Sequence, residues 1–175
     1  MNDPKPHVRG DRVTIRPTTE GDLRDLMGLW NDGRVMRWVG FPDGLGYDSE
    51  KIHAWYERIQ SNPECHHFVV RAGDVGFCGE VYYAVDRTHR RAGLDIKFRP
   101  EAQGHGLATD ALTALIDLVF GAEPDVDAVW TEPSEENIAA QKLYARCGLA
   151  PRPRPPDLGS GESYWERRRG DSPQG

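Results

Sequence analysis

Apolar residues along the chain follow two spacings, which divide it into strands and helices. Val13 and Ile15 alternate with polar neighbours in 12–18 and predict a strand, whereas Leu23, Leu26 and Trp30 recur at helical spacing. The same patterns predict two strands within 66–85 around a turn at 72–74, and single strands at 93–98, 127–132 and 163–168. They also predict three further helices. One begins at Ser49, one follows the stretch 103–112, and one extends from Ser134 to about Cys147. Four prolines make 150–161 irregular.

Polar residues mark the ends of these helices. Thr19 with Asp22 three residues on predicts a capping box, Ser49 and Ser134 are expected to cap the next helices, and Gly148 stops the last one. The predicted order is β-α-α-β-β-β-α-β-α-β. This order indicates the α/β class, with helices on both faces of a mixed sheet.

The length of 175 residues predicts one domain, over 11–169, with flexible ends at 1–10 and 170–175. Residues 1–10 lack the apolar core of a signal peptide, and no apolar run reaches the length of a membrane span, so we expect a cytoplasmic protein without a membrane partner. The net charge of −6 argues against nucleic-acid binding and favours small or cationic partners. The three cysteines have no metal-binding spacing, and no metal is assigned.

The stretch "QGHGLATDAL", 103–112, places two glycines where a strand gives way to a helix. The first N–H groups of a helix have no internal partner, and glycine lets an anion approach the backbone closely. A phosphate or pyrophosphate near Gly104, Gly106 and Ala108 is therefore one hypothesis, and a turn that needs glycine only for its φ angles is the other. A dinucleotide fingerprint would have glycine or alanine where this chain has Thr109, and it would lie near the start of the fold, whereas this motif comes late in the chain. The absence of Gly-Lys-Ser/Thr excludes a P-loop.

A second motif follows about thirty residues later. Together the two motifs resemble the GNAT superfamily of acyl-CoA-dependent N-acetyltransferases. The family's Gln/Arg-Gly-x-Gly-x-Gly/Ala motif is matched in full by 103–108, and its Asn-x-x-Ala-x-x-Leu-Tyr-x-x-x-Gly-hydrophobic motif is matched in full by 137–149. The resemblance extends from about Arg12 to Arg168, and the N-terminal half is similar to the Rim-type branch, which includes ribosomal-protein-alanine N-acetyltransferases.

This resemblance implies a GNAT fold, with a mostly antiparallel sheet that splays into a V between strands four and five, "GLDIKF" and "DAVWTE". Acetyl-CoA would be the co-substrate, with its pantetheine arm along strand four, its pyrophosphate on the glycine motif, and an amine attacking the thioester directly in a ternary complex. Tyr144 would protonate the leaving thiolate, and a backbone N–H near 96–98 would bind the oxyanion. The implied cofactor-binding residues are Ile96, Lys97, Phe98, Gln103, Gly104, His105, Gly106, Leu107, Ala108, Thr109, Asn137 and Tyr144.

The general base is left open among three carboxylates. Glu132 ends the fifth strand, where GNATs that acetylate ribosomal N-termini place a catalytic glutamate, although pairing with an arginine is the competing interpretation. Many other GNATs place the glutamate at the start of strand four, where this chain reads Arg91-Ala92-Gly93. Glu80 and Asp95 are the further candidates.

Three hypotheses remain for the acceptor, and the resemblance leaves a homodimer open. The first is a peptide or protein α-amine, the second is a small polyamine or aminoglycoside, favoured by a deep and acidic cleft, and the third is acyl-CoA binding without catalysis. Aromatic residues of the N-terminal half are expected to line the acceptor cleft in part: Trp38, Phe41, Tyr47, Trp55 and Tyr83.

Overall fold

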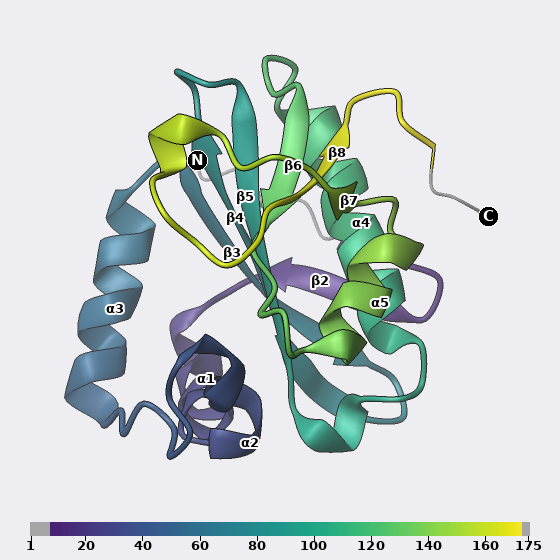
Figure 1. The fold of residues 1–175 in the computed structure, drawn as a ribbon. Helices are drawn as coiled ribbons and strands as arrows, with labels where there is room; N and C mark the ends of the chain where they lie inside the picture. The colour runs from purple at the N-terminus through teal and green to yellow at the C-terminus, as the bar shows by residue number, and fades with distance from the viewer. Residues whose placement is uncertain (1–7, 173–175) are drawn as a thin grey trace, which may run out of the picture.

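A computed structural model describes residues 8–172 and shows one eight-stranded sheet, in the order β1-β2-β3-β4-β5-β6-β8-β7 (Figure 1). The strands are β1 Val8–Arg9, β2 Val13–Pro17, β3 Cys65–Ala72, β4 Gly76–Asp86, β5 Arg91–Phe98, β6 Ala128–Thr131, β7 Ala150–Pro151 and β8 Trp165–Arg168. The helices are α1 Leu23–Trp30, α2 Gly33–Met36, α3 Ser49–Ser61, α4 Leu107–Ala122 and α5 Ile138–Arg146, with short 3₁₀ turns at Glu20–Asp22, Arg37–Val39, Pro100–Ala102 and Pro156–Leu158.

All neighbouring strands pair antiparallel except β5 and β6, which are parallel. Their pairing covers only three positions, Arg91–Gly93 opposite Ala128–Trp130. Beyond Gly93, β5 continues to Phe98 beside β4, whereas β6 continues beside β8. The two central strands therefore splay apart, as the resemblance implied between strands four and five.

Helices cover both faces of the sheet. On one face, α4 buries Leu112, Leu115 and Ile116 against side chains of β2, β4 and β5 in the main core. On the other face, α1 and α3 bury a second cluster that includes Leu26, Trp30, Ile52 and the β3 residue Val69. Figure 1 shows α1 and α3 together on one side of the central strands and α4 and α5 on the other.

The predicted elements are present, with several differences at their ends. The capping box of Thr19 and Asp22 is confirmed. The residue that caps α3 is Asp48, whose carboxylate accepts from the Lys51 N–H, rather than Ser49. The cap of α5 is Asn137 rather than Ser134, because residues 134–137 form a turn before the helix.

At the described ends of the chain, backbone groups form hydrogen bonds, and the flexibility expected for 1–10 and 170–175 stays a prediction. Val8 and Arg9 pair with β2, and Asp171 accepts a hydrogen bond from the Arg168 N–H through its carboxylate. Residues 1–7 and 173–175 lie outside the described part of the chain. Within 8–172, no helix is long and apolar enough to cross a membrane.

Candidate active site

The splay between β5 and β6 opens onto backbone groups near the end of β5. The Ile96 N–H donates to its neighbour Asp95 at 2.9 Å, and the Phe98 carbonyl accepts from the Gln103 side chain at 2.9 Å. Residues 96–98, predicted to hold the arm of the donor, therefore lie next to the glycine motif. The Ile96 N–H, a candidate oxyanion donor, is already bonded to a carboxylate.

The glycine motif forms a tight loop at the start of α4, and we call residues 103–108 the glycine loop. Gly104 and Gly106 adopt φ angles of +82° and +76°, in the left-handed region that favours glycine. No described heavy atom lies within 4 Å of a Cβ built on Gly104, so the loop surface there is open. Gly106 precedes the first helical residue and supplies no side-chain cap, which leaves the amides of Leu107, Ala108 and Thr109 at the helix N-terminus for an anion.

Tyr144 lies on α5, almost fully buried, near the Thr131 side chain at the end of β6. Burial, together with the charge of Asp95, raises the pKa of Tyr144 to about 12. The phenol therefore stays protonated at neutral pH and can donate a proton. Asn137, the other polar residue of the second motif, caps α5 through its side-chain oxygen on the Ala140 N–H at 3.1 Å, so its amide NH₂ is the part that can reach a ligand.

Glu132 follows Thr131 directly and is ion-paired with Arg154 at 2.9 Å. Arg154 also donates to the carbonyls of Leu158, Gly159 and Ser163, and thereby holds the proline-rich segment 152–163, which we call the strap. Glu132 accepts the Glu162 N–H at 3.1 Å as well. The pair of Glu132 and Arg154 therefore orders the strap, which Figure 1 shows in yellow-green crossing in front of the central strands.

A buried polar network lies on the sheet face that packs against α1 and α3. The Glu80 carboxylate contacts the Trp30 indole N–H at 2.9 Å, the His67 Nε2 at 2.7 Å and the Lys97 ammonium at 3.5 Å. Thr18 holds the other ring nitrogen of His67 at 2.7 Å. Burial alone would raise the pKa of Glu80, but His67 and Lys97 overcome it and lower this pKa to about 2. Glu80 is thus a fixed anion.

Asp95 and Lys97 extend this network towards Tyr144. Their side chains form an ion pair with each other, and Lys97 also faces Glu80. Burial lowers the pKa of Lys97, but the two carboxylates outweigh it and raise the pKa above its usual value. The Asp95 side chain is 44% exposed, whereas that of Glu80 is 5% exposed. Of the two, only Asp95 is accessible to an incoming amine.

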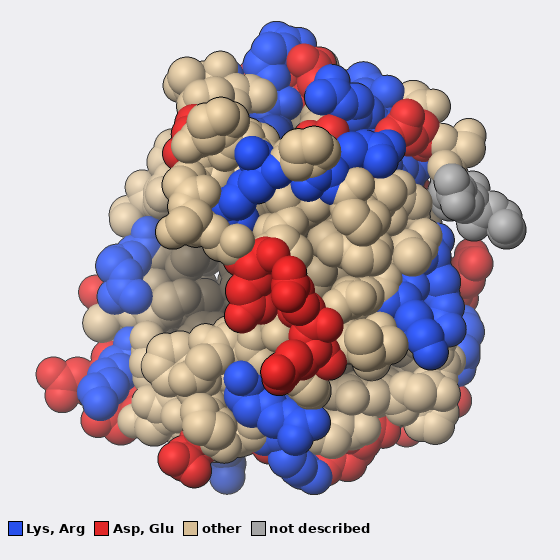
Figure 2. Space-filling model, viewed as in Figure 1, with Lys and Arg blue, Asp and Glu red and all other residues tan. Residues whose placement is uncertain are grey.

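An acidic patch borders the opening on the same side of the molecule. We call Glu132, Glu135, Glu136 and Glu162 the acidic rim; its members come from the start of the β6–α5 connection and from the strap, and the Glu135 N–H donates to Glu162 at 3.3 Å. Figure 2 shows a continuous acidic patch beside a hollow that lies between α3, α1 and the strap. Cationic groups entering this hollow pass the carboxylates.

The aromatic residues expected to line an acceptor cleft lie in three different surroundings. Trp55 and Tyr47 are half-buried and pack edge-on against Trp30, on the side of α1 and α3. The expectation for Tyr83 is wrong, because its buried ring stacks between His66 and Phe68 on the opposite face, in the main core. Phe41 is 47% exposed, and Trp38 is half-buried beneath the Arg37 guanidinium.

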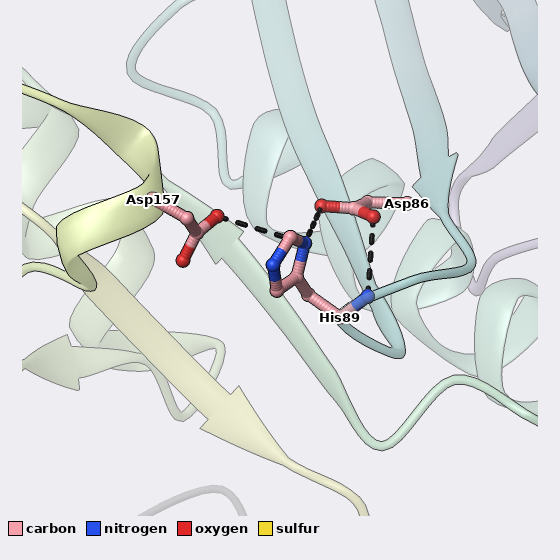
Figure 3. A group of neighbouring side chains, drawn as sticks. All are labelled: Asp86, His89 and Asp157. Carbon is pink, nitrogen blue, oxygen red and sulfur yellow. Dashed lines mark hydrogen bonds and ion pairs between the residues drawn. The ribbon is translucent and has the colours of Figure 1, made fainter.

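A cluster with metal-ligand chemistry also ties the strap to the β4–β5 turn (Figure 3). Asp86, His89 and Asp157 bring one potential ligand atom each within 4.8 Å of one another. Arg91 is hydrogen-bonded to both carboxylates, and His89 Nδ1 lies 2.8 Å from Asp86 and 3.6 Å from Asp157. A guanidinium already counters the negative charge, so we interpret this cluster as a clasp for the strap and assign no metal to it.

Sequence reasoning missed the clasp, the strap and the network around Glu80. Their members come from distant parts of the chain, such as Arg91 and Asp157, which are 66 residues apart, and they meet only through the antiparallel register of β3, β4 and β5 and the path of the strap. One signal was present: Glu80 and Tyr82 alternate with apolar residues in β4, which places two polar side chains on one face of a strand.

The protein has an α/β fold with a central splay, a backbone loop that can hold phosphate, and a buried tyrosine at the opening. These features define a class of enzyme that transfers an acyl group from a phosphate-bearing donor. Residues 12–150 match the family model "Acetyltransferase (GNAT) domain", so the chain belongs to the GNAT acetyltransferase family. It is an acyl-CoA-dependent N-acetyltransferase that uses acetyl-CoA.

Relatives with different acceptors resemble the chain. Spermidine N(1)-acetyltransferase of Vibrio cholerae is 29% identical over 142 residues, which cover 79% of each chain. Aminoglycoside N(6')-acetyltransferase type 1 of Klebsiella pneumoniae is 23% identical over 79% of this chain and 74% of its own. The solved structure of the ribosomal alpha-N-protein acetyltransferase RimL with coenzyme A superposes with a TM-score of 0.78 at 11% identity, over 93% of this chain and 98% of that one, and shows a shared fold.

Proposed function

We propose that this protein acetylates a primary amine of a small polycationic acceptor. The acidic rim beside the hollow carries the proposal, since the carboxylates of Glu135, Glu136 and Glu162 attract and orient a molecule with several ammonium groups, while that of Glu132 is paired with Arg154. Asp95 adds a further half-exposed carboxylate next to the predicted reaction centre. The relatives named for spermidine and aminoglycoside acetylation have acceptors of this chemistry.

In the proposed reaction, the acetyl thioester lies in the splay with its diphosphate on the glycine loop. The neutral amine attacks the thioester carbonyl, and the C–S bond breaks as the amide bond forms. Tyr144 donates its proton to the leaving thiolate, which its buried and protonated hydroxyl suits. The Ile96 N–H stabilises the oxyanion once it exchanges its bond to Asp95.

We assign the base to Asp95 in preference to Glu132 and Glu80. Glu80 is enclosed by three partners and has a strongly lowered pKa, which makes it a poor proton acceptor. Glu132 and Asp95 are both ion-paired, with Arg154 and Lys97, but the Glu132 side chain is 34% exposed and also accepts the Glu162 N–H of the strap, whereas the Asp95 side chain is 44% exposed. Asp95 is accessible and lies close enough to Tyr144 to influence its pKa, so it can take the amine's proton directly or through one water.

The proposal is tested by thiol release from acetyl-CoA with a panel of amines: linear polyamines, an aminoglycoside, and short peptides beginning with alanine or serine. We expect release with a polycationic amine and little with the peptides. Thiol release with the peptides alone would show that the acceptor is a peptide α-amine. Coenzyme A binding without thiol release for any amine would show that the protein is a non-catalytic acyl-CoA-binding module.

Replacing the rim glutamates by glutamine removes their charge and keeps their size, and so tests whether the acidic rim attracts the amine. In the variant Glu135→Gln, Glu136→Gln, Glu162→Gln, we expect KM for the polycationic amine to rise about ten-fold and KM for acetyl-CoA to stay the same. Asp117→Asn on the exposed side of α4 is the matched control, because it removes a carboxylate from another face. Equal effects of the rim variant and the control on the acceptor would contradict the proposal.

A further inference from the structure

Arg12, just before β2, reaches the glycine loop from a segment more than ninety residues away in sequence. Its guanidinium donates a hydrogen bond to the carbonyl oxygen of His105, which lies between the two glycines. A Cβ built on Gly106 would lie 3.5 Å from Arg12 Nη1, so the guanidinium lies against the loop backbone. The N-terminal segment thus contributes a charged side chain to the loop.

Asp110, in the first turn of α4, fixes the segment that carries Arg12. Its carboxylate accepts the backbone N–H groups of Asp11 at 2.8 Å, Arg12 at 2.7 Å and Val13 at 2.9 Å. A Cβ on Gly10 would approach the same carboxylate to 2.6 Å, so a side chain at position 10 would push the Asp110 carboxylate aside. Asp110 anchors the segment to α4, and Arg12 in turn anchors the glycine loop to the segment.

These contacts determine the direction of one peptide group in the loop. The C=O and N–H of a planar trans peptide point in opposite directions. Because the His105 carbonyl points towards Arg12, the N–H of Gly106 points away from it. Successive N–H groups turned to one side form an anion-binding concavity, which continues into the amides at the start of α4.

We infer that Arg12 is a positioning residue for the diphosphate of the acyl donor. It holds the peptide between His105 and Gly106 in the orientation that presents the Gly106 N–H to the phosphate. The Asp110 carboxylate accepts three N–H groups of the N-terminal segment, so its negative charge faces that segment. Arg12 also places a positive charge beside the loop, which favours the anion.

The test compares two donors that differ in the diphosphate: acetyl-CoA, and acetyl-pantetheine, which has the same thioester arm without phosphates. For Arg12→Met we expect KM for acetyl-CoA and Kd for coenzyme A to rise about ten-fold, the usual effect of losing a hydrogen bond from a charged group. The values of kcat with acetyl-CoA and of kcat/KM with acetyl-pantetheine should stay the same. Arg12→Lys keeps a charged donor and should recover part of the affinity.

Arg16→Met is the control, since Arg16 lies four residues further along, in β2, but pairs with Asp22, away from the loop. Thermal unfolding of each variant identifies any loss of fold. The inference is overturned if Arg12→Met leaves Kd for coenzyme A unchanged. It is equally overturned if both donors lose activity in proportion, because Arg12 would then support the fold and not the diphosphate. Thiol release with any accepted amine serves as the assay, so the result does not depend on the acceptor proposed above.

Discussion

The two sides of the predicted reaction centre are built differently. The donor side comes from two short runs, 103–109 and 137–149, each at a helix start, and relies on backbone amides, glycine and one tyrosine. The acceptor side draws on charged and aromatic side chains from Thr18 to Ser163, brought together by β3, β4, β5, α1 and the strap. A phosphate can be held by backbone that many sequences provide, whereas selection among amines needs side chains placed across several elements.

The largest expected effect comes from the donor side. Tyr144→Phe should lower kcat by roughly 10²–10⁴-fold for every accepted amine, because the leaving thiolate loses its proton donor. Steady-state thiol release and coenzyme A titration measure kcat and Kd separately, and Kd should stay the same. Tyr164→Phe is the control, since it removes another buried hydroxyl, one bonded to Glu166 at 2.6 Å. If kcat is unchanged in Tyr144→Phe, Tyr144 is a core residue without a catalytic role.

The next effect concerns the stability of the acceptor side. Glu80→Gln should lower the free energy of unfolding by about 3–5 kcal/mol at pH 7, because Lys97 loses a buried counter-charge. Urea denaturation measures this, with the exposed Glu57→Gln of α3 as control.

The pH dependence of stability should change in the same variant. The folded pKa of Glu80, about 2, lies below its ordinary value near 4.5, so its contribution is complete above about pH 4.5 and is lost as the pH falls towards 2. The wild-type protein should therefore lose more stability than Glu80→Gln across this range. Parallel acid unfolding of the two proteins would contradict a fixed anion at this position.

A smaller effect distinguishes the candidate bases. Asp95→Asn should lower kcat/KM about 10²-fold, since the amine loses its proton acceptor. Glu132→Gln should mainly raise KM for the amine, through a less ordered strap. The two isosteric variants control for each other. The reverse result, with kcat lowered about 10²-fold only in Glu132→Gln, would make Glu132 the base.

The smallest effect concerns the clasp in Figure 3. Asp157→Asn weakens the contacts of the strap to Arg91 and His89, and we expect KM for the amine to rise two- to five-fold, about the effect of one partly exposed ion pair. KM for acetyl-CoA should not change. Asp127→Asn, which breaks the exposed pair with Arg90 away from the strap, is the control. An identical small change in both variants would remove the strap from acceptor binding.

Most of the fold could be predicted from local patterns, and the errors have physical causes. The strands and long helices followed from period-two and helical spacing, and the Thr19–Asp22 capping box was confirmed. The short strands β1 and β7, of two residues each, have too little sequence for a periodic signal and form only by pairing with β2 and β8. Tyr83 was placed in a cleft because alternation along β4 does not say which face carries which helix.

Sequence alone determined the family and the donor, and it predicted the donor-side residues, because a glycine loop and a helix start act through backbone geometry encoded by adjacent residues. Only the tertiary structure decided how the carboxylates divide their roles. Burial and three partners make Glu80 a fixed anion, the pair with Arg154 ties Glu132 to the strap, and Asp95 remains accessible beside Tyr144. The chemical role of a carboxylate depends on its solvation and neighbouring charges, and in this protein those neighbours come from distant parts of the chain.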